Sequence, residues 1–248
     1  MFFLPFAILT LSALGRAHVV SRHSTINKPI CLDNVTAAFH KAHIVPDVIS
    51  SFNPKVGVDT LFTDPVTKAN VEVVPGILLT TEQTDQPPQW SLASDRDLSN
   101  SKTTWVITIV DPDALTPQDP SIAQFLHFIG QGFIVDNSLA PNRGKNTVSL
   151  TNVSSALVEF FHPSPPAGSD PHRYVILVYV QPDDFEEKGL AYFNGTIPPG
   201  TDFREFFNIT DFASKTALGE PVAGNFFLVG PDADASRETV NNLPFPFN

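Results

Sequence analysis

The most constraining feature of the sequence is an apolar segment that ends in a turn with two carboxylates. Residues 105–110 read Trp-Val-Ile-Thr-Ile-Val, all aromatic or β-branched, which is typical of a buried strand. Asp-Pro-Asp follows at 111–113, and strand pairing should end there because proline has no N–H to donate. A second apolar segment, Phe125–Val135, carries His127 near its start. The pattern predicts two strands that place a histidine beside paired carboxylates at one end of a sheet.

Length and composition bound the architecture and exclude some partners. A chain of 248 residues with 42% hydrophobic residues suits one domain with a substantial core. The net charge of −11 argues against nucleic acid, which requires a basic face, and against nonspecific adhesion to anionic lipid. The only cysteine, Cys31, cannot form an intrachain disulfide, so stability must come from the core.

The N-terminal residues 1–17 have the pattern of a secretory signal peptide. Phe2–Leu14 is apolar but too short to span a bilayer, and Gly-Arg-Ala at 15–17 offers small residues for cleavage. We expect a cleaved signal, a secreted, extracellular protein and no stable membrane insertion; a buried N-terminal helix is the alternative. Secretion agrees with four Asn-x-Ser/Thr sequences, which are candidate glycosylation sites: Asn34, Asn152, Asn194 and Asn208.

The remaining chain divides into three parts. Residues 18–34 lack a clear period and are expected to form a flexible mature N-terminus, and residues 231–248 a loosely ordered, proline-bearing tail. Between them, residues 35–230 contain short apolar segments at regular spacing, separated by proline and glycine turns. This spacing predicts an antiparallel β-sandwich with one or two short helices.

The expected elements of this central part follow from local patterns. Helices are expected before Val45 and over Phe206–Leu218, the second with Asn208 or Thr210 as N-cap and Gly219 as its stop. The expected strands are Val56–Phe62, Val71–Leu79, Trp105–Asp111, Leu126–Val135, Ala156–Phe161, Tyr174–Val180 and Phe226–Val229. The expected polar loops and turns are Glu82–Asn100, Asp136–Val148 and Pro182–Lys188.

Four motifs in order resemble those of the phosphatidylethanolamine-binding protein (PEBP) family. They are Ile44–Val48, then Asp111–Ala114 with His127-Phe128, then Pro165–Gly168 with His172–Gln181, and finally Leu218–Phe226. The resemblance covers roughly residues 35–230. It implies a mainly β, PEBP-like fold with a large central antiparallel sheet, a smaller sheet on one side, and short N-terminal and C-terminal helices.

The resemblance also implies a small cup that binds phosphate or a phospholipid headgroup such as phosphorylethanolamine. Carried over by position, the implied ligand-binding residues are Asp111, Asp113, Ala114, Phe125, His127, His172 and Tyr174. The two imidazoles and the tyrosine hydroxyl can donate to an anion, while an aspartate orients a histidine ring. The sequence departs from the family pattern at three rim positions, Leu115, Ile122 and His162.

The sequence leaves three functional classes to compare. The first is a secreted, non-enzymatic binding protein for phospholipid headgroups or small anions. The second is an inhibitor of a serine carboxypeptidase or another protease, because some family members have that role. An enzyme is the third: the carboxylates and histidines of the cup could ligate a metal or act as acid–base pairs. No His-x-x-x-His spacing or nucleophile elbow supports it, so we expect no enzyme activity, no cofactor and no metal.

Overall fold

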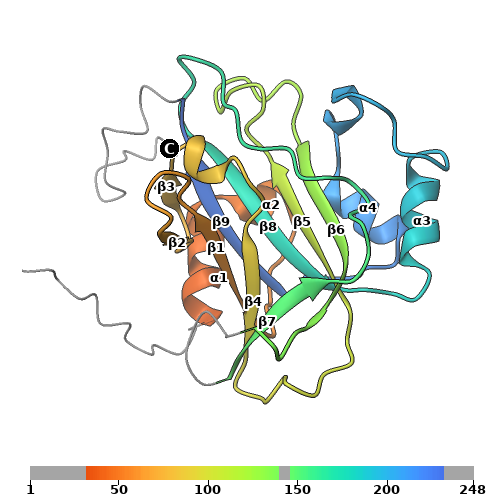
Figure 1. The fold of residues 1–248 in the computed structure, drawn as a ribbon. Helices are drawn as coiled ribbons and strands as arrows, with labels where there is room; N and C mark the ends of the chain where they lie inside the picture. The colour runs from red at the N-terminus through yellow and green to blue at the C-terminus, as the bar shows by residue number, and fades with distance from the viewer. Residues whose placement is uncertain (1–31, 140–145, 232–248) are drawn as a thin grey trace, which may run out of the picture.

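The computed structural model describes residues 32–139 and 146–231 (Figure 1). The predicted signal peptide, Cys31, most of the predicted N-terminal segment and the tail beyond Pro231 lie outside these ranges. Helix α1 begins at Leu32, so the last residues of the segment that we expected to be flexible are helical. Within the described ranges, no helix is both long and apolar enough to cross a membrane.

The strands of the described residues form one continuous, curled sheet. In chain order they are β1 Gly57–Thr63, β2 Asn70–Glu72, β3 Ile77–Leu79, β4 Gln89–Ala93, β5 Trp105–Asp111, β6 Phe125–Val135, β7 Thr147–Asn152, β8 His172–Val180 and β9 Ala223–Val229. Their order in space is β2-β1-β4-β7-β6-β5-β8-β9-β3. Neighbouring strands are antiparallel except β3 and β9, which are parallel.

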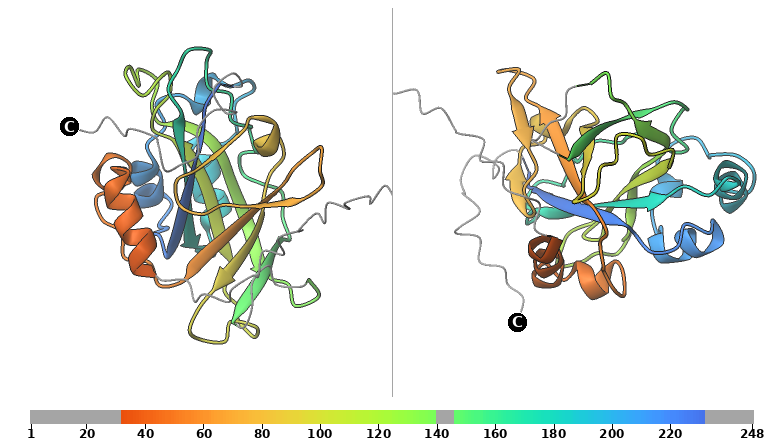
Figure 2. Two further views of the ribbon diagram at one scale, coloured as in Figure 1. Left: turned by 90° about the vertical axis from the view of Figure 1, so that its left-hand side faces the viewer. Right: turned by 90° about the horizontal axis from the view of Figure 1, so that it is seen from below.

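Short helices cover one face of this sheet. They are α1 Leu32–Lys41, α2 Ile44–Asp47, α3 Phe185–Tyr192 and α4 Ile209–Lys215, with 3-10 turns at Glu82–Thr84 and Asp202–Arg204. Figure 2 shows α1 and α2 against one face of β8 and β9, with β1 and β4 beyond the opposite face. The sheet therefore separates two hydrophobic cores.

The central strand β5 contributes to both cores. Val106 and Val110 pack in the core shared with the helices, whereas Ile107 and Ile109 pack in the core shared with β1 and β4. All residues of β5 are buried. Because successive side chains point to opposite faces and both faces are covered, β5 carries apolar residues on both faces instead of alternating, with Thr108 as the polar exception before Asp111.

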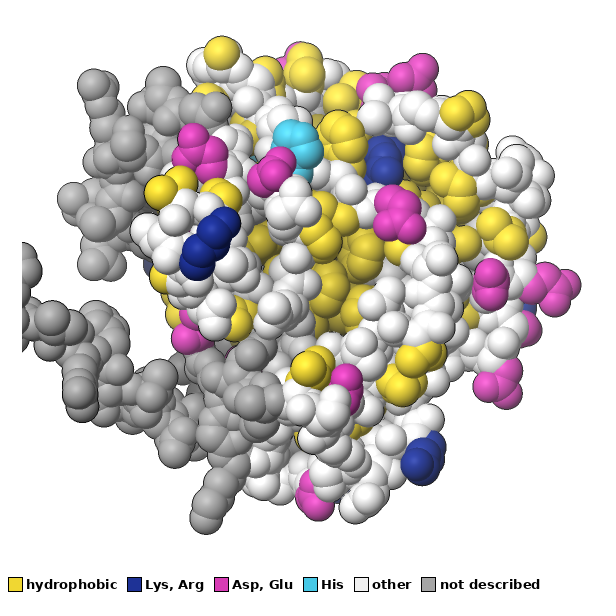
Figure 3. All heavy atoms as spheres, in the orientation of Figure 1, with side chains coloured by type: hydrophobic (Ala, Val, Ile, Leu, Met, Phe, Trp, Pro, Cys, Tyr) yellow, Lys and Arg dark blue, Asp and Glu magenta, His cyan; other side chains and the backbone are white. Residues whose placement is uncertain are grey.

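The predicted mainly β fold with short helices is confirmed. The expected larger and smaller sheets are joined through β7, which pairs with β4 on one side and with β6 on the other. On the face drawn in Figure 3, basic side chains are sparse and lie among acidic and apolar ones. This distribution accords with the net charge of −11.

One strand lies inside a segment that we predicted to be a polar loop, and a second strand overlaps the end of another. β4 follows Pro87-Pro88 and buries Trp90 and Leu92, although the flanking residues are polar. β7 begins near the end of the second predicted loop and buries Val148 and Leu150. Each strand is short and pairs on both edges, so tertiary partners rather than a long apolar run specify it.

Two other predicted segments have a different structure. Residues 156–161, predicted as a strand, pair with β6 through an isolated bridge between Val158 and Ile129 and one hydrogen bond from the Phe161 N–H to the His127 carbonyl. Leu157 and Val158 are buried in the core shared with the helices. The predicted strand 71–79 is split into β2 and β3 by the Pro75-Gly76 turn, in which Gly76 has a φ of 82°.

The acidic turn predicted at 182–188 is instead the start of α3. Glu186 and Glu187 lie in its first turn, where carboxylates interact favourably with the helix dipole. The helix predicted over 206–218 is shorter, and Asn208 is its N-cap: its side chain accepts a hydrogen bond from the Asp211 N–H.

Candidate functional site

Three strand ends meet at one edge of the sheet. β5 ends at Asp111, and its antiparallel neighbours β6 and β8 begin at Phe125 and His172. The register pairs Asp111 with Phe125 and Val110 with Val175. The two motifs that the sequence singled out are therefore brought together by pairing on both sides of β5.

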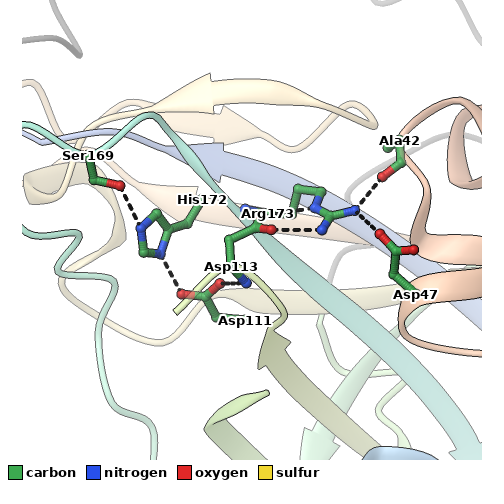
Figure 4. Close-up of polar contacts among 7 residues, drawn as sticks. All are labelled: Ala42, Asp47, Asp111, Asp113, Ser169, His172 and Arg173. Carbon is green, nitrogen blue, oxygen red and sulfur yellow. Dashed lines mark hydrogen bonds and ion pairs between the residues drawn. The ribbon is translucent and has the colours of Figure 1, made fainter. Parts of the chain in front are cut away.

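The ring of His172 lies between Asp111 and Ser169 (Figure 4). Its Nδ1 is 2.7 Å from Asp111 Oδ2, and its Nε2 is 2.9 Å from Ser169 Oγ. The Ser169 hydroxyl donates to the Asp170 carbonyl, so the Nε2–H of His172 donates to Ser169. The other oxygen of Asp111 accepts from the Asp113 N–H at 2.7 Å. Both ring nitrogens of His172 are thus engaged within the protein.

Burial dominates the electrostatics of this pair. It raises the pKa of the Asp111 carboxyl, and the hydrogen bond and charge of His172 oppose that rise without cancelling it. The proton between Asp111 Oδ2 and His172 Nδ1 is shared by that pair, so this nitrogen is not available to a ligand. Asp111 therefore orients His172, as expected, but His172 has no ring nitrogen left to donate to a ligand, which differs from the expectation.

The distances of Ser169, His172 and Asp111 are those of a serine hydrolase triad. The Ser169 hydroxyl, however, is directed at a backbone carbonyl, and Ser169 is only 4% exposed. A nucleophile needs its hydroxyl proton directed at the base and its oxygen accessible to substrate. The arrangement fixes the histidine ring instead of activating the serine.

The second histidine, His127, is hydrogen-bonded at one nitrogen only. Nδ1 lies 2.7 Å from the carbonyl oxygen of Phe161, which can only accept, so Nδ1 carries the proton. Burial is the main cause that lowers the pKa of His127 to about 3, and repulsion from Arg204 adds to it. At neutral pH the ring is uncharged, and its Nε2 presents a lone pair.

Aromatic side chains surround this imidazole. The ring centroids of Phe125 and Tyr174 both lie 5.0 Å from that of His127. Tyr174 also stacks on His172 at 6.4 Å, so the rings form a continuous row across β6 and β8. Burial, with Asp111 adding repulsion, raises the pKa of Tyr174 well above its usual value, so its hydroxyl stays protonated.

Asp113 belongs to a different cluster. Both of its carboxylate oxygens accept from the Arg173 guanidinium, at 2.9 and 2.7 Å, and one also accepts from the Arg173 N–H (Figure 4). Arg173 further contacts the carbonyl of Ala42 and the carboxylate of Asp47. Because Arg173 and His172 are adjacent in β8, their side chains lie on opposite faces, and Asp113 is held by Arg173. The charge of Asp113 still contributes to the raised pKa of Tyr174.

The remaining predicted positions lie around the strand ends. Ala114 is buried, and its carbonyl accepts from the N–H of half-buried Ile122 at 3.1 Å. Leu115 is 49% exposed, and His162 is exposed with its Nδ1 3.2 Å from the Pro163 carbonyl. In the described part of the chain, no group of three or more His, Cys, Asp or Glu side chains is arranged to hold a metal.

Sequence reasoning missed Arg204. It lies in the 3-10 turn before α4, is 7% exposed, and donates to the carbonyls of Leu126, His127 and Glu159. Its guanidinium also lies 5.4 Å from the Phe161 ring centroid. Nothing local marks this arginine, because its partners are backbone carbonyls of distant segments.

Comparisons with known proteins agree with this fold. The profile of the family described as phosphatidylethanolamine-binding protein matches residues 69–227. The chain is similar to the carboxypeptidase Y inhibitor of Saccharomyces cerevisiae, with 27% identity over 63% of this chain and 78% of that protein. It is also similar to phomoidride biosynthesis cluster protein N of a fungal species, with 51% identity over 27% of this chain. That match spans only 29% of the fungal protein.

A solved structure has the same fold. The carboxypeptidase Y inhibitor, in complex with its cognate proteinase, superposes with a TM-score of 0.63 and 22% identity. The superposition covers 80% of this chain and 96% of the inhibitor chain.

Proposed function

Because the chain belongs to the phosphatidylethanolamine-binding protein family, we propose that it is a non-enzymatic binding protein for a phosphate or phospholipid-headgroup-like anion. The observation that carries the proposal is the row of rings formed by His127, Tyr174 and His172 at the joined ends of β5, β6 and β8. Its polar atoms lie in a region where burial strengthens hydrogen bonds.

The geometry suggests a role for each residue. The Tyr174 hydroxyl keeps its proton and can donate to the anion. His127 offers the lone pair of Nε2. His172, with both nitrogens engaged by Asp111 and Ser169, serves as a rigid support on which Tyr174 stacks. The oxygens of the Asp111 carboxyl, whose pKa burial raises, contact the His172 ring and the Asp113 N–H.

The test is a calorimetric titration of the purified protein with phosphorylethanolamine, phosphate and acetate. Tyr174→Phe should weaken phosphate binding by about fivefold or more, because it removes one hydrogen bond to an anion. Tyr179→Phe is the matched control: Tyr179 is equally buried on the same strand but packs in the other core. Absence of binding by the wild type would refute the function and leave the fold unaffected.

A second candidate function is inhibition of a serine carboxypeptidase. It is favoured by the identity of 27% to a carboxypeptidase Y inhibitor. The discriminating assay compares the full-length protein with a chain that starts at Leu32, which keeps α1 intact. If residues before α1 contact the protease, inhibition should be lost in the shorter chain while anion binding is retained. No inhibition by either chain would eliminate this candidate.

A further inference from the structure

We propose that the site selects an anion that still carries a proton, such as the monoanion of a phosphate monoester, over a dianion or a diester. This inference rests on the proposed function and specifies the ligand of that same site. It is carried by the hydrogen bond between His127 Nδ1 and the Phe161 carbonyl, 2.7 Å long.

The tautomer of His127 is fixed by a reciprocal contact. The Phe161 N–H donates to the His127 carbonyl at 2.9 Å, so the Phe161 carbonyl lies beside the imidazole and receives its Nδ1–H. In a neutral imidazole the other nitrogen is then an acceptor. No described residue donates to Nε2, and His127 is 3% exposed. A ligand that fills the site must supply a donor, because a buried lone pair without one is unfavourable.

Burial, reinforced by nearby charges, keeps the imidazole neutral. Arg204 Nη1 lies 3.2 Å from the His127 carbonyl, and within the described ranges Arg204 forms no ion pair with a carboxylate. The titratable groups that act on His127 are Arg204, His172 and His162, from three different segments, and each disfavours a proton on its ring. Nε2 is thus available as an acceptor across the physiological pH range.

The positive charge of Arg204 determines which kind of donor can bind at Nε2 of His127. An ammonium group at Nε2 would be repelled by Arg204, whereas the hydroxyl of a monoanionic phosphate donates to Nε2 while its charge is attracted to the guanidinium. A phosphate dianion or a sulfate would place oxygen lone pairs against the lone pair of Nε2. A phosphate diester has the charge but no proton to donate.

Three small probes separate these cases: methyl phosphate, dimethyl phosphate and sulfate. We expect methyl phosphate to bind the wild type with an affinity that falls about tenfold per pH unit above its second pKa, about 6. Sulfate and dimethyl phosphate should bind at least about tenfold more weakly than methyl phosphate at pH values below that pKa. Binding of glycerophosphorylethanolamine, a phosphate diester that carries an ammonium group, tests whether an ammonium can serve as the donor to Nε2.

The variant is His127→Gln, with His40→Gln as control because His40 is exposed on α1. A glutamine amide can turn either its carbonyl or its NH₂ toward the ligand, so preference for methyl phosphate over sulfate should fall to less than about threefold. The control should keep the wild-type ratio. Circular dichroism verifies folding; if His127→Gln does not fold, the pH profile and probe ratios of the wild type still decide the question.

The possible outcomes are distinguishable. The inference would be wrong, with the proposed function still standing, if sulfate, dimethyl phosphate or glycerophosphorylethanolamine bound as tightly as methyl phosphate. It would also be wrong if the affinity for methyl phosphate rose with pH. Absence of binding for every anion would overturn the proposed function and this inference together. Loss of affinity above the second pKa, with discrimination that depends on His127, would support both.

Discussion

The two histidines of the site show how environment assigns different roles to one residue type. His172 has a carboxyl group and a hydroxyl as partners, whereas His127 has a single carbonyl and several aromatic neighbours. The Phe161 carbonyl fixes the tautomer of His127 and by itself raises the pKa of the ring, but burial outweighs it and disfavours the charged form. The burial of His127 therefore links the stability of the fold to pH.

We expect His127→Gln to make stability less sensitive to acid. In the wild type, the unfolded state binds a proton at this residue below pH 6.5, while the folded state does not until about pH 3. Stability therefore falls as pH decreases through this window, by up to about 1.4 kcal/mol per pH unit from this group. Urea unfolding at several pH values should show a smaller slope for the variant and an unchanged slope for His40→Gln. Equal slopes for all three proteins would contradict the neutral, buried assignment.

The two carboxylates that contact Arg173 should differ in their contribution to stability. Asp113→Asn leaves a buried guanidinium without its bidentate partner and should cost about 3–5 kcal/mol of unfolding free energy. The side chain of Asp47 is 43% exposed, against 7% for Asp113. Asp47→Asn should therefore lower the unfolding free energy by less than about 1 kcal/mol. Urea denaturation of both variants measures the difference, and similar costs would contradict the assigned burial.

At the scale of elements, the short helices depend on the sheet for their position. α1 and α2 are linked to β8 by Arg173, which donates to the Ala42 carbonyl and contacts Asp47. α1 also packs through Phe39, which stacks on Phe52 with ring centroids 4.2 Å apart. Helices of this length are marginal alone, so these contacts decide whether α1 forms.

We expect Gly224→Ala to loosen the packing of α1 on β9. A Cβ at this position would lie 2.8 Å from Phe39 Cζ and 3.1 Å from the Ile176 carbonyl. Since Phe39 is stacked on Phe52, the overlap should cost about 1–3 kcal/mol. Amide hydrogen exchange should accelerate in α1 and remain slow in β5, which β8 separates from β9 in the sheet. Unchanged exchange in α1 would show that Phe39 adapts freely.

At the scale of the whole molecule, the sequence features that indicate secretion lead to a separate prediction. We propose that the protein is secreted after cleavage near Ala17 and carries N-linked glycans. Asn152 and Asn194 are exposed, in the last residue of β7 and in the turn after α3. Asn208 is exposed but its Oδ1 caps α4.

Expression in a eukaryotic secretory host tests this proposal. The protein in the medium should lack its first residues and lose mass on treatment with an N-glycosidase. A double variant, Asn152→Gln with Asn194→Gln, should lose less mass than the wild type on the same treatment, because both sites are exposed. A protein that remains in the cells with its N-terminus intact and without glycans would contradict secretion.

The local sequence determined the elements whose own side chains specify them. β5 and β6 follow from continuous apolar runs bounded by polar turns, and α4 from an Asn cap with a glycine beyond its end. The aspartate turn and the two histidines were also evident, because strand ends and their polar residues are marked within a few positions of one another.

Only the tertiary structure decided how those residues are paired. Strands β4 and β7 exist because they have partners on both edges, and Arg204 matters because carbonyls of distant segments surround it. The partners of His127, His172 and Arg173 lie 34, 61 and 60 positions away in the chain. Sequence patterns encode the period of an element but not its register against others, and register sets each hydrogen bond, tautomer and pKa shift of the site.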